Sequence, residues 1–141
     1  MNKLKSTMAQ QIAQAAVAFE EQRTGRAPNK VTVVLTGDTL VITLHGVMSP
    51  AEKALAESSA GAARVREFHR QLFAASSDSL VDEIQRITGQ AVREAAAEIE
   101  PSTGTVVKVF TTGTEVQVFR LAGDVPTDTW TGKGIELDGQ P

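Results

Sequence analysis

The sequence contains no cysteine, so disulfide bonds, thiolate metal ligands and cysteine nucleophiles are all excluded. Aromatic residues make up only 4% of the 141 residues, with five Phe, one Trp and no Tyr, so Val, Ile, Leu and Ala must build the core. Basic residues are in slight deficit. The formal net charge of -3 argues against a general nucleic-acid binder, which normally carries a basic surplus.

Long apolar runs are missing too. No stretch approaches the roughly 20 apolar residues of a membrane-spanning helix, and glutamines interrupt each candidate apolar core of a signal peptide. The chain has 41% hydrophobic and 22% charged residues, which is typical of a globular domain of this length. We therefore expect a cytoplasmic protein with a single domain over residues 1–122. A flexible tail rich in Gly, Thr, Asp and Pro is expected over residues 123–141.

The first part of the chain predicts a helix followed by a β-hairpin. Apolar residues spaced by three and four mark one face of the helix, and Gly25 ends it. These apolar residues are Leu4, Met8, Ile12, Ala15 and Phe19. Two β-branched runs then surround Gly37 and Asp38, which indicates a hairpin with one core face and one polar face. The core face holds Val31, Val33, Leu35, Leu40, Ile42 and Leu44.

A complete helix start stands at Ser49, Pro50 and Glu52. The Ser hydroxyl can accept from the third helical N–H, Pro50 needs no donor at the first position, and Glu52 can reach back to the Ser49 N–H. Two helices are expected to follow, over about residues 50–75 and 79–88, with small residues around Gly61 able to interrupt the first. Gly89 ends the second. The expected apolar faces comprise Leu55, Val65, Phe68 and Leu72, and then Leu80, Ile84 and Ile87.

The remaining segments predict a second hairpin. Residues 91–100 are rich in Ala and Glu, which favours a helix, although alternation also fits a strand. Residues 105–113 are typical of a strand, which would pair with residues 91–100 if that segment is a strand too. Residues 114–123 can add a further strand.

No arrangement of residues indicates catalysis, a cofactor or a metal. His45 and His69 have no ligand spacing to each other, so we interpret both as ordinary histidines on polar faces. The carboxylate pairs Glu20-Glu21 and Asp82-Glu83 fit solvated helix faces. The sequence therefore predicts a protein that is not an enzyme.

One expected helix carries a cluster of arginines, Arg64, Arg66 and Arg70. Arg66 and Arg70 are four residues apart and are therefore neighbours on the helix surface. Either the arginines pair locally with Glu67 or Glu57, as surface arginines commonly do, or they bind an anionic or protein partner.

The order of the motifs resembles the MpsC-like family of bacterial proteins. The stretches "TGRAP", "LHGVMSPAEKALA", "DEIQRITGQAV" and "STGTVVKVF" follow one another as the turn, helix start, T-G-x-x-V segment and last hairpin of that family do, over about residues 5–112. None of these motifs is catalytic, and the specificity lies in their order. The chain departs from the family at Ala27, where Gly is usual, at Met48 and Ser49, where Leu and Thr are usual, and in the tail after Thr112.

The family is named for a cation-translocating, membrane-potential-generating system linked to inorganic carbon supply. The resemblance implies a non-enzymatic accessory or regulatory subunit that contacts a membrane transporter complex, with a peripheral position at the inner face of the membrane. It also favours a strand over residues 91–100. The alternatives are a small enzyme of inorganic-carbon or small-anion chemistry using His45 or His69, and a nucleic-acid-binding module on the arginine-rich helix.

The expected fold is α+β in the order α-β-β-α-α-β-β, with two hairpins forming an antiparallel sheet covered by helices on one face. The uncovered face and the sheet edges favour a homodimer. The expected partner-binding residues are Arg26, which follows the helix-ending Gly25, together with Arg66 and Arg70. Arginine suits such a surface because it presents a planar fork to carboxylates.

Overall fold

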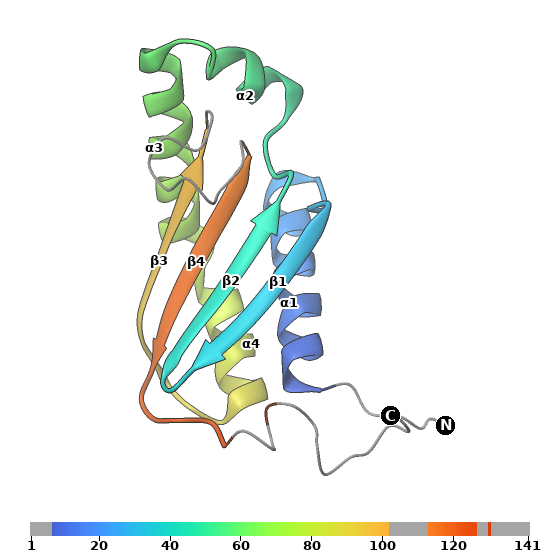
Figure 1. Ribbon diagram of the computed structural model, residues 1–141, viewed down its shortest axis with the longest axis vertical. Helices are drawn as coiled ribbons and strands as arrows, with labels where there is room; N and C mark the ends of the chain where they lie inside the picture. Colours follow the sequence, from blue (N-terminus) through green and yellow to red (C-terminus); the bar gives the residue numbers. More distant parts are fainter. Residues whose placement is uncertain (1–6, 102–112, 127–129, 131–141) are drawn as a thin grey trace, which may run out of the picture.

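The computed structural model describes residues 7–101, 113–126 and 130. Its strands form one antiparallel sheet of four strands in the order β1-β2-β4-β3 (Figure 1). The predicted α+β class is confirmed. The elements are α1 (Met8–Thr24), β1 (Lys30–Thr36), β2 (Thr39–His45), α2 (Pro50–Leu55), α3 (Ser59–Ser76), α4 (Asp78–Thr88), β3 (Val92–Glu100) and β4 (Thr114–Leu121).

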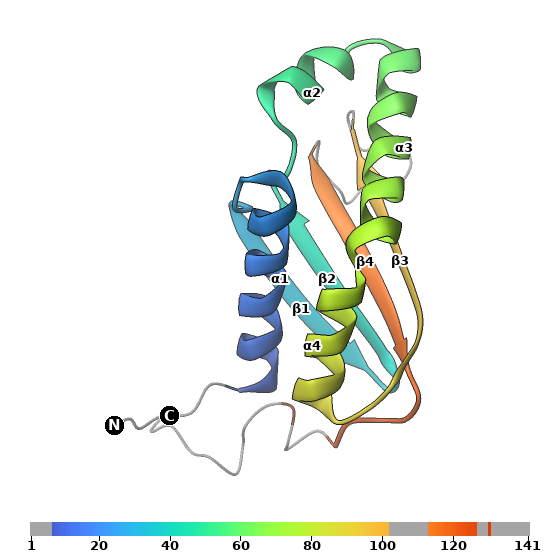
Figure 2. The same ribbon diagram turned by 180° about the vertical axis from the view of Figure 1, so that it is seen from behind.

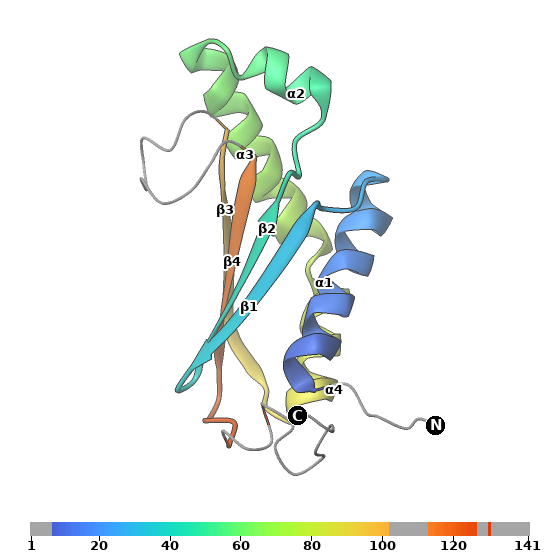
Figure 3. The ribbon, with the colours of Figure 1, turned by 45° about the vertical axis from the view of Figure 1, so that its right-hand side comes forward.

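The helices α1, α3 and α4 lie on one face of the sheet, as the views from behind and from the side show (Figures 2 and 3). The core lies between these two layers. Its largest members come from α1, α3 and the central strands, and include Ile12, Phe19, Phe73 and Phe119. The ring of Phe73 contacts those of Phe19 and Phe119, with centroids 6.4 and 6.0 Å away, so the few aromatics are concentrated where the layers meet.

No helix of the described residues covers the opposite face of the sheet (Figures 1 and 3). An apolar row crosses this open face, because the strand register places Val34 beside Val41, Val41 beside Val118 and Val118 beside Ala96. Val34 is 49% exposed, Val41 and Val118 are half-buried, and Ala96 is exposed. We call these residues the valine row.

The predicted β1–β2 hairpin is confirmed, with its turn at Gly37 and Asp38. Gly37 has a φ of 61°, which a residue with a side chain rarely adopts. The predicted core face is confirmed as well, since Leu40, Ile42 and Leu44 are fully buried on β2.

The helix expected over residues 50–75 is interrupted near Gly61, as its small residues allowed, and the structure divides it into α2 and α3. The Ser58 hydroxyl accepts the Gly61 N–H at 3.0 Å and caps the start of α3. A Cβ at Gly61 would lie 1.7 Å from the Leu55 carbonyl oxygen. The glycine thus permits the two helices to meet closely at the break.

The predicted apolar face of α3 is partly wrong. Phe68, expected inside, is 54% exposed, whereas its neighbour His69 is only 2% exposed. Val65 is buried as predicted, Leu72 is half-buried and Phe73 takes the inner position. The inner face is therefore shifted by one residue, because carboxylates inside the protein pair with the His69 ring.

The predicted strand over residues 91–100 is confirmed as β3, against its local helix propensity. β3 pairs with β4, Thr114–Leu121, and β4 lies between β2 and β3. The strand predicted over residues 105–113, and its expected pairing with residues 91–100, lie outside the described residues except for Gly113. Of the predicted tail, Val125 and Trp130 pack against the core, while residues 127–129 and 131–141 lie outside the described part.

Candidate functional site

Ionisable and amide side chains occupy the core between α1, α3 and β4. Glu20, Arg23, His69, Glu115 and Gln117 all have buried side chains, with only 4% of the Arg23 side chain exposed. Glu52, at the start of α2, lies nearer the protein surface and contacts His69. We call these side chains the buried network: Glu20, Arg23, Glu52, His69, Glu115 and Gln117.

Arg23 joins α1 to the central strand β4. Its Nη2 donates to Glu20 Oε1 at 2.7 Å and to Glu115 Oε2 at 2.9 Å, and its Nε donates to Glu20 Oε1 at 3.0 Å. Gln117 Nε2 donates to the same Glu115 oxygen at 2.9 Å. The guanidinium also lies over the Phe19 ring, 4.7 Å from its centroid. Such a charge is tolerated inside because carboxylates pair with it.

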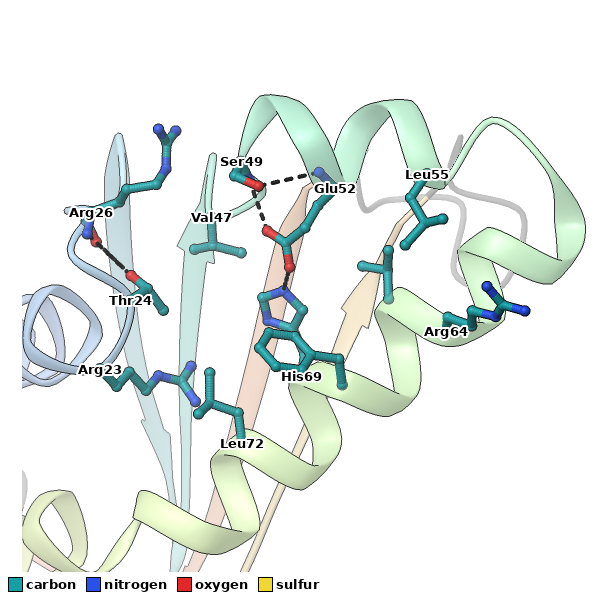
Figure 4. Close-up of a pocket in the computed structure, with 12 residues that line it drawn as sticks. Arg23, Thr24, Arg26, Val47, Ser49, Glu52, Leu55, Arg64, His69 and Leu72 are labelled. Carbon is teal, nitrogen blue, oxygen red and sulfur yellow. Dashed lines mark hydrogen bonds and ion pairs between the residues drawn. The ribbon is translucent and has the colours of Figure 1, made fainter.

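His69 lies between two carboxylates. Its Nδ1 is 3.2 Å from Glu115 Oε1, and its Nε2 is 2.7 Å from Glu52 Oε2. The predicted helix start is confirmed: the Ser49 N–H donates to Glu52 Oε1 at 2.8 Å and the Glu52 N–H donates to the Ser49 hydroxyl at 3.2 Å. Figure 4 shows Glu52 between Ser49 and His69. One carboxylate therefore caps α2 and holds the buried histidine.

The charges inside the network shift its pKa values in a consistent way. Burial alone would lower the pKa of His69, but Glu115 and Glu52 together raise it above 6.5. Burial alone would raise the pKa of Glu115, but His69, Arg23 and Gln117 hold it below its ordinary value. Burial raises the pKa of Glu20, although Arg23 opposes this effect. The network thus favours an imidazolium between two carboxylates.

Some polar atoms of the network have no hydrogen-bond partner. Glu20 Oε2, Arg23 Nη1 and Gln117 Oε1 are buried without one. An unsatisfied buried polar atom costs about 1–3 kcal/mol, more if it is charged. The buried network therefore carries a free-energy cost for these unsatisfied atoms, and its stability depends on Arg23 and His69 remaining paired.

The raised pKa of His69 predicts a pH dependence of stability. A group whose folded pKa is raised stabilises the fold fully below its unfolded pKa, here 6.5, and this contribution is lost as the pH rises through the folded value. We expect the free energy of unfolding in urea to fall as the pH rises above about 6.5 and through the raised folded pKa of His69, and His69→Gln to flatten that slope. NMR titration of the imidazole should give a pKa above 6.5. A value at or below 6.5 would contradict the ion pairing.

A pocket of about 540 Å³ opens beside the network, between the end of α1, the start of α2 and the first turns of α3 (Figure 4). Apolar side chains from α2, α3 and the β2–α2 connection form its walls. Arg23 and His69 of the network reach it from one side. Its lining comprises Arg23, Thr24, Arg26, Val47, Ser49, Glu52, Leu55, Arg64, Val65, Phe68, His69 and Leu72.

The arginines predicted to bind a partner lie in different places. Arg26 lines the pocket, together with Arg64. Arg70 lines a smaller hollow of about 350 Å³ beside β3 and pairs with Glu67 and Glu98. Arg66 is half-buried on α3 and lines neither. The structure therefore does not bring Arg26 together with Arg66 and Arg70.

Sequence reasoning missed the buried network. Glu20 was assigned to a solvated face and His69 to a polar face, and both assignments are wrong, because each residue is buried against charged partners. His45, by contrast, is half-buried at the end of β2. A usable signal was the alternation in "TEVQVFRL", where Glu115 and Gln117 share the inward face with Phe119.

The described residues, 7–101, 113–126 and 130, offer neither a metal site nor a membrane span. They contain no group of three or more His, Asp or Glu side chains placed to hold a metal ion. No helix among them has the length and apolar content needed to cross a membrane.

The fold and the network define a small α+β protein with a helix-covered antiparallel sheet and charged residues in its core. The chain belongs to the MpsC family, described as "Na+-translocating membrane potential-generating system (MpsC)", which matches residues 4–114. The resemblance inferred from the motifs is thus confirmed. The chain is also 26% identical over 110 residues to a Bacillus subtilis (strain 168) protein named "Uncharacterized protein YbcI", covering 78% of this chain and 89% of that protein. No solved structure matches the chain.

Proposed function

We propose that this chain is a non-enzymatic accessory subunit that acts through protein contacts with membrane-bound components of a Na+-translocating, membrane-potential-generating system. The family description supports the system, and the valine row on the open sheet face is the observation that supports protein contacts. The contacts of His69 support a non-enzymatic role, because both of its ring nitrogens are already bonded to carboxylates.

The occupant that we propose for the valine row is a second copy of the chain. An open sheet face with an apolar row suits packing against an identical face, since each row then removes the other from water. This arrangement leaves α3 and its arginines on the other side of each protomer, where the membrane-bound partner would bind.

Introducing a charge into the valine row should separate the dimer. We expect Val34→Asp to sediment as a monomer at micromolar concentration while the parent sediments as a dimer, because the carboxylate would be buried without a partner. Ala18→Asp is the matched control, since Ala18 is exposed on α1, away from the row. A parent protein that is monomeric at this concentration would contradict the homodimer.

Reversing charge on α3 should weaken partner capture without unfolding the protein. The ion pairs of Arg70 are exposed and Arg66 pairs with none of the described residues, so we expect Arg66→Glu with Arg70→Glu to leave the melting temperature nearly unchanged. Capture of the membrane components from detergent-solubilised native membranes should fall about tenfold.

Lys53→Glu on α2 is the control for non-specific charge effects in this capture. If the double variant folds and captures the same membrane components at the same level, the arginines are only solvated surface. If the parent captures ribosomal or nucleoid proteins and no membrane component, the accessory role itself is wrong.

A further inference from the structure

Apolar side chains are unusually exposed at the pocket beside the buried network. Among the described residues the large hydrophobic side chains with high exposure are Val34, Leu55 and Phe68, and the last two both line this pocket, with 44% and 54% exposed. Val47, Val65 and Leu72 continue the apolar wall inward. Exposed apolar side chains that cluster in one pocket indicate a binding site, whereas single exposed apolar side chains spread over a surface do not.

The charges around the pocket favour an anion. The guanidinium groups of Arg26 and Arg64 have no ion-pair partner among the described residues, and Figure 4 shows these arginines on opposite sides of the pocket, extended outward at its rim. The carboxylate that lines the pocket, Glu52, is already held by Ser49 and His69. The rim therefore offers free positive charge, whereas the lining carboxylate is already engaged.

Arg23 differs from the two arginines at the rim, because it is held by carboxylates and only its Nη1 lacks a hydrogen-bond partner. The Arg23 side chain lines the pocket while almost fully buried, and this nitrogen has no acceptor. The nitrogen is covered, so it cannot bond a ligand directly without movement, and the Arg23 charge is already paired with Glu20 and Glu115. The free positive charge of this site therefore lies at the rim, on Arg26 and Arg64.

We propose that this pocket binds a small amphipathic carboxylate, with its apolar chain against Val65, Phe68 and Leu72 and its carboxylate at Arg26 or Arg64. The volume of about 540 Å³ is in the range of small-molecule sites, which are mostly apolar with a few polar groups that fix orientation. Arginine at the rim can bind the head group in bidentate fashion while its stem extends the apolar wall. The site is separate from the valine row and does not include Arg66 and Arg70, but it includes Arg26, which the sequence analysis assigned to the partner.

Decanoate is a suitable probe for this site, with the full-length protein studied by isothermal titration calorimetry. We expect decanoate to bind with a dissociation constant below about 1 mM. Acetate lacks the chain, 1-decanol lacks the charge, and decyltrimethylammonium reverses the charge. Each of these should bind at least about tenfold more weakly, because each removes one of the two kinds of contact.

Variants of the pocket then locate the site. Arg26→Gln with Arg64→Gln should weaken decanoate binding about tenfold, and Phe68→Ala should weaken it to a similar degree. Arg66→Gln is the matched control, because Arg66 lies on the same helix but does not line the pocket, and it should bind decanoate as the parent does. All of these side chains are at least partly exposed, so the variants should fold.

The proposal is overturned if decanoate does not bind at about 1 mM, or if 1-decanol binds as tightly as decanoate. It is also overturned if the double arginine variant binds decanoate unchanged. If Phe68→Ala instead abolishes the dimer in sedimentation, the pocket is a contact between copies of the chain rather than a ligand site.

Discussion

Replacing Arg23 with methionine should lower the free energy of unfolding by about 3–5 kcal/mol, the usual cost of removing one partner from a buried ion pair. Methionine keeps much of the stem that packs on Phe19 but leaves Glu20 and Glu115 without the guanidinium that bonds both. The two carboxylates would then repel each other in the core. Urea unfolding followed by circular dichroism measures the change.

Arg86→Met is the matched control for this experiment. Arg86 pairs with Glu83 in the same i,i+3 geometry as Arg23 with Glu20, but both members are exposed. We expect no measurable loss, because exposed ion pairs contribute little. Adding Glu20→Gln to Arg23→Met should restore part of the stability, because it removes one buried carboxylate that has lost its partner. Equal stability of Arg23→Met and the parent would show that the carboxylates are not buried as described.

Gly61→Ala should lower the free energy of unfolding by about 3 kcal/mol, although alanine is the better helix former. The gain in helix propensity is at most about 1 kcal/mol. The new Cβ, however, would lie 1.7 Å from the Leu55 carbonyl oxygen, and backbone cannot yield as a flexible side chain does. Steric overlap therefore outweighs propensity, and α2 must move away from α3.

Gly25→Ala is the control for Gly61→Ala, because it introduces backbone strain without steric overlap. Gly25 has a φ of 79° and open space around its Cβ position, so alanine there should cost about 1–2 kcal/mol through conformation alone. The variant Gly61→Ala should exceed that cost and should also alter the pocket, since α2 and α3 form its walls. A stabilised Gly61→Ala variant would mean that the close approach of the helices does not exist in solution.

The position of Glu52 links these results. Its carboxylate caps α2 through Ser49 and bonds His69, so the helix at the mouth of the pocket and the charges behind the pocket are not independent. Movement of α2 therefore alters the environment of His69, and titration of His69 alters the capping carboxylate. The NMR titration of His69 should accordingly respond to Gly61→Ala.

Much of the fold followed from local patterns. The φ values of 79° at Gly25 and 74° at Gly89 occur where the sequence predicted helix ends, and the start of α2 is the predicted capping box. These features depend on a few neighbouring residues, so a single sequence is enough to recognise them. The strand β3 was different. Its alanines and glutamates favour a helix, while its alternation also fits a strand, and the family resemblance favoured the strand. Pairing with β4 overrides the local helix propensity.

Much less of the candidate site could be predicted from the sequence. Arg26 was expected to bind a partner and does line the pocket, but Arg64 accompanies it there instead of Arg66 and Arg70. Whether a residue on α3 faces the core or the solvent depends on how the helix is rotated about its own axis. That rotation placed Phe68 outside and His69 inside, which the spacing of apolar residues alone could not reveal.

Caps, turns and periodicity act over a few residues, so they were enough to predict most helices, the β1–β2 hairpin and the α+β class. The central position of β4 and the burial of charged side chains depend instead on contacts between distant parts of the chain. Arg23 and Glu115 are 92 positions apart, and each supplies part of the charge pairing that keeps the other stable inside. Polarity read along the chain predicts exposure, whereas burial of a charge depends on partners that the fold brings together.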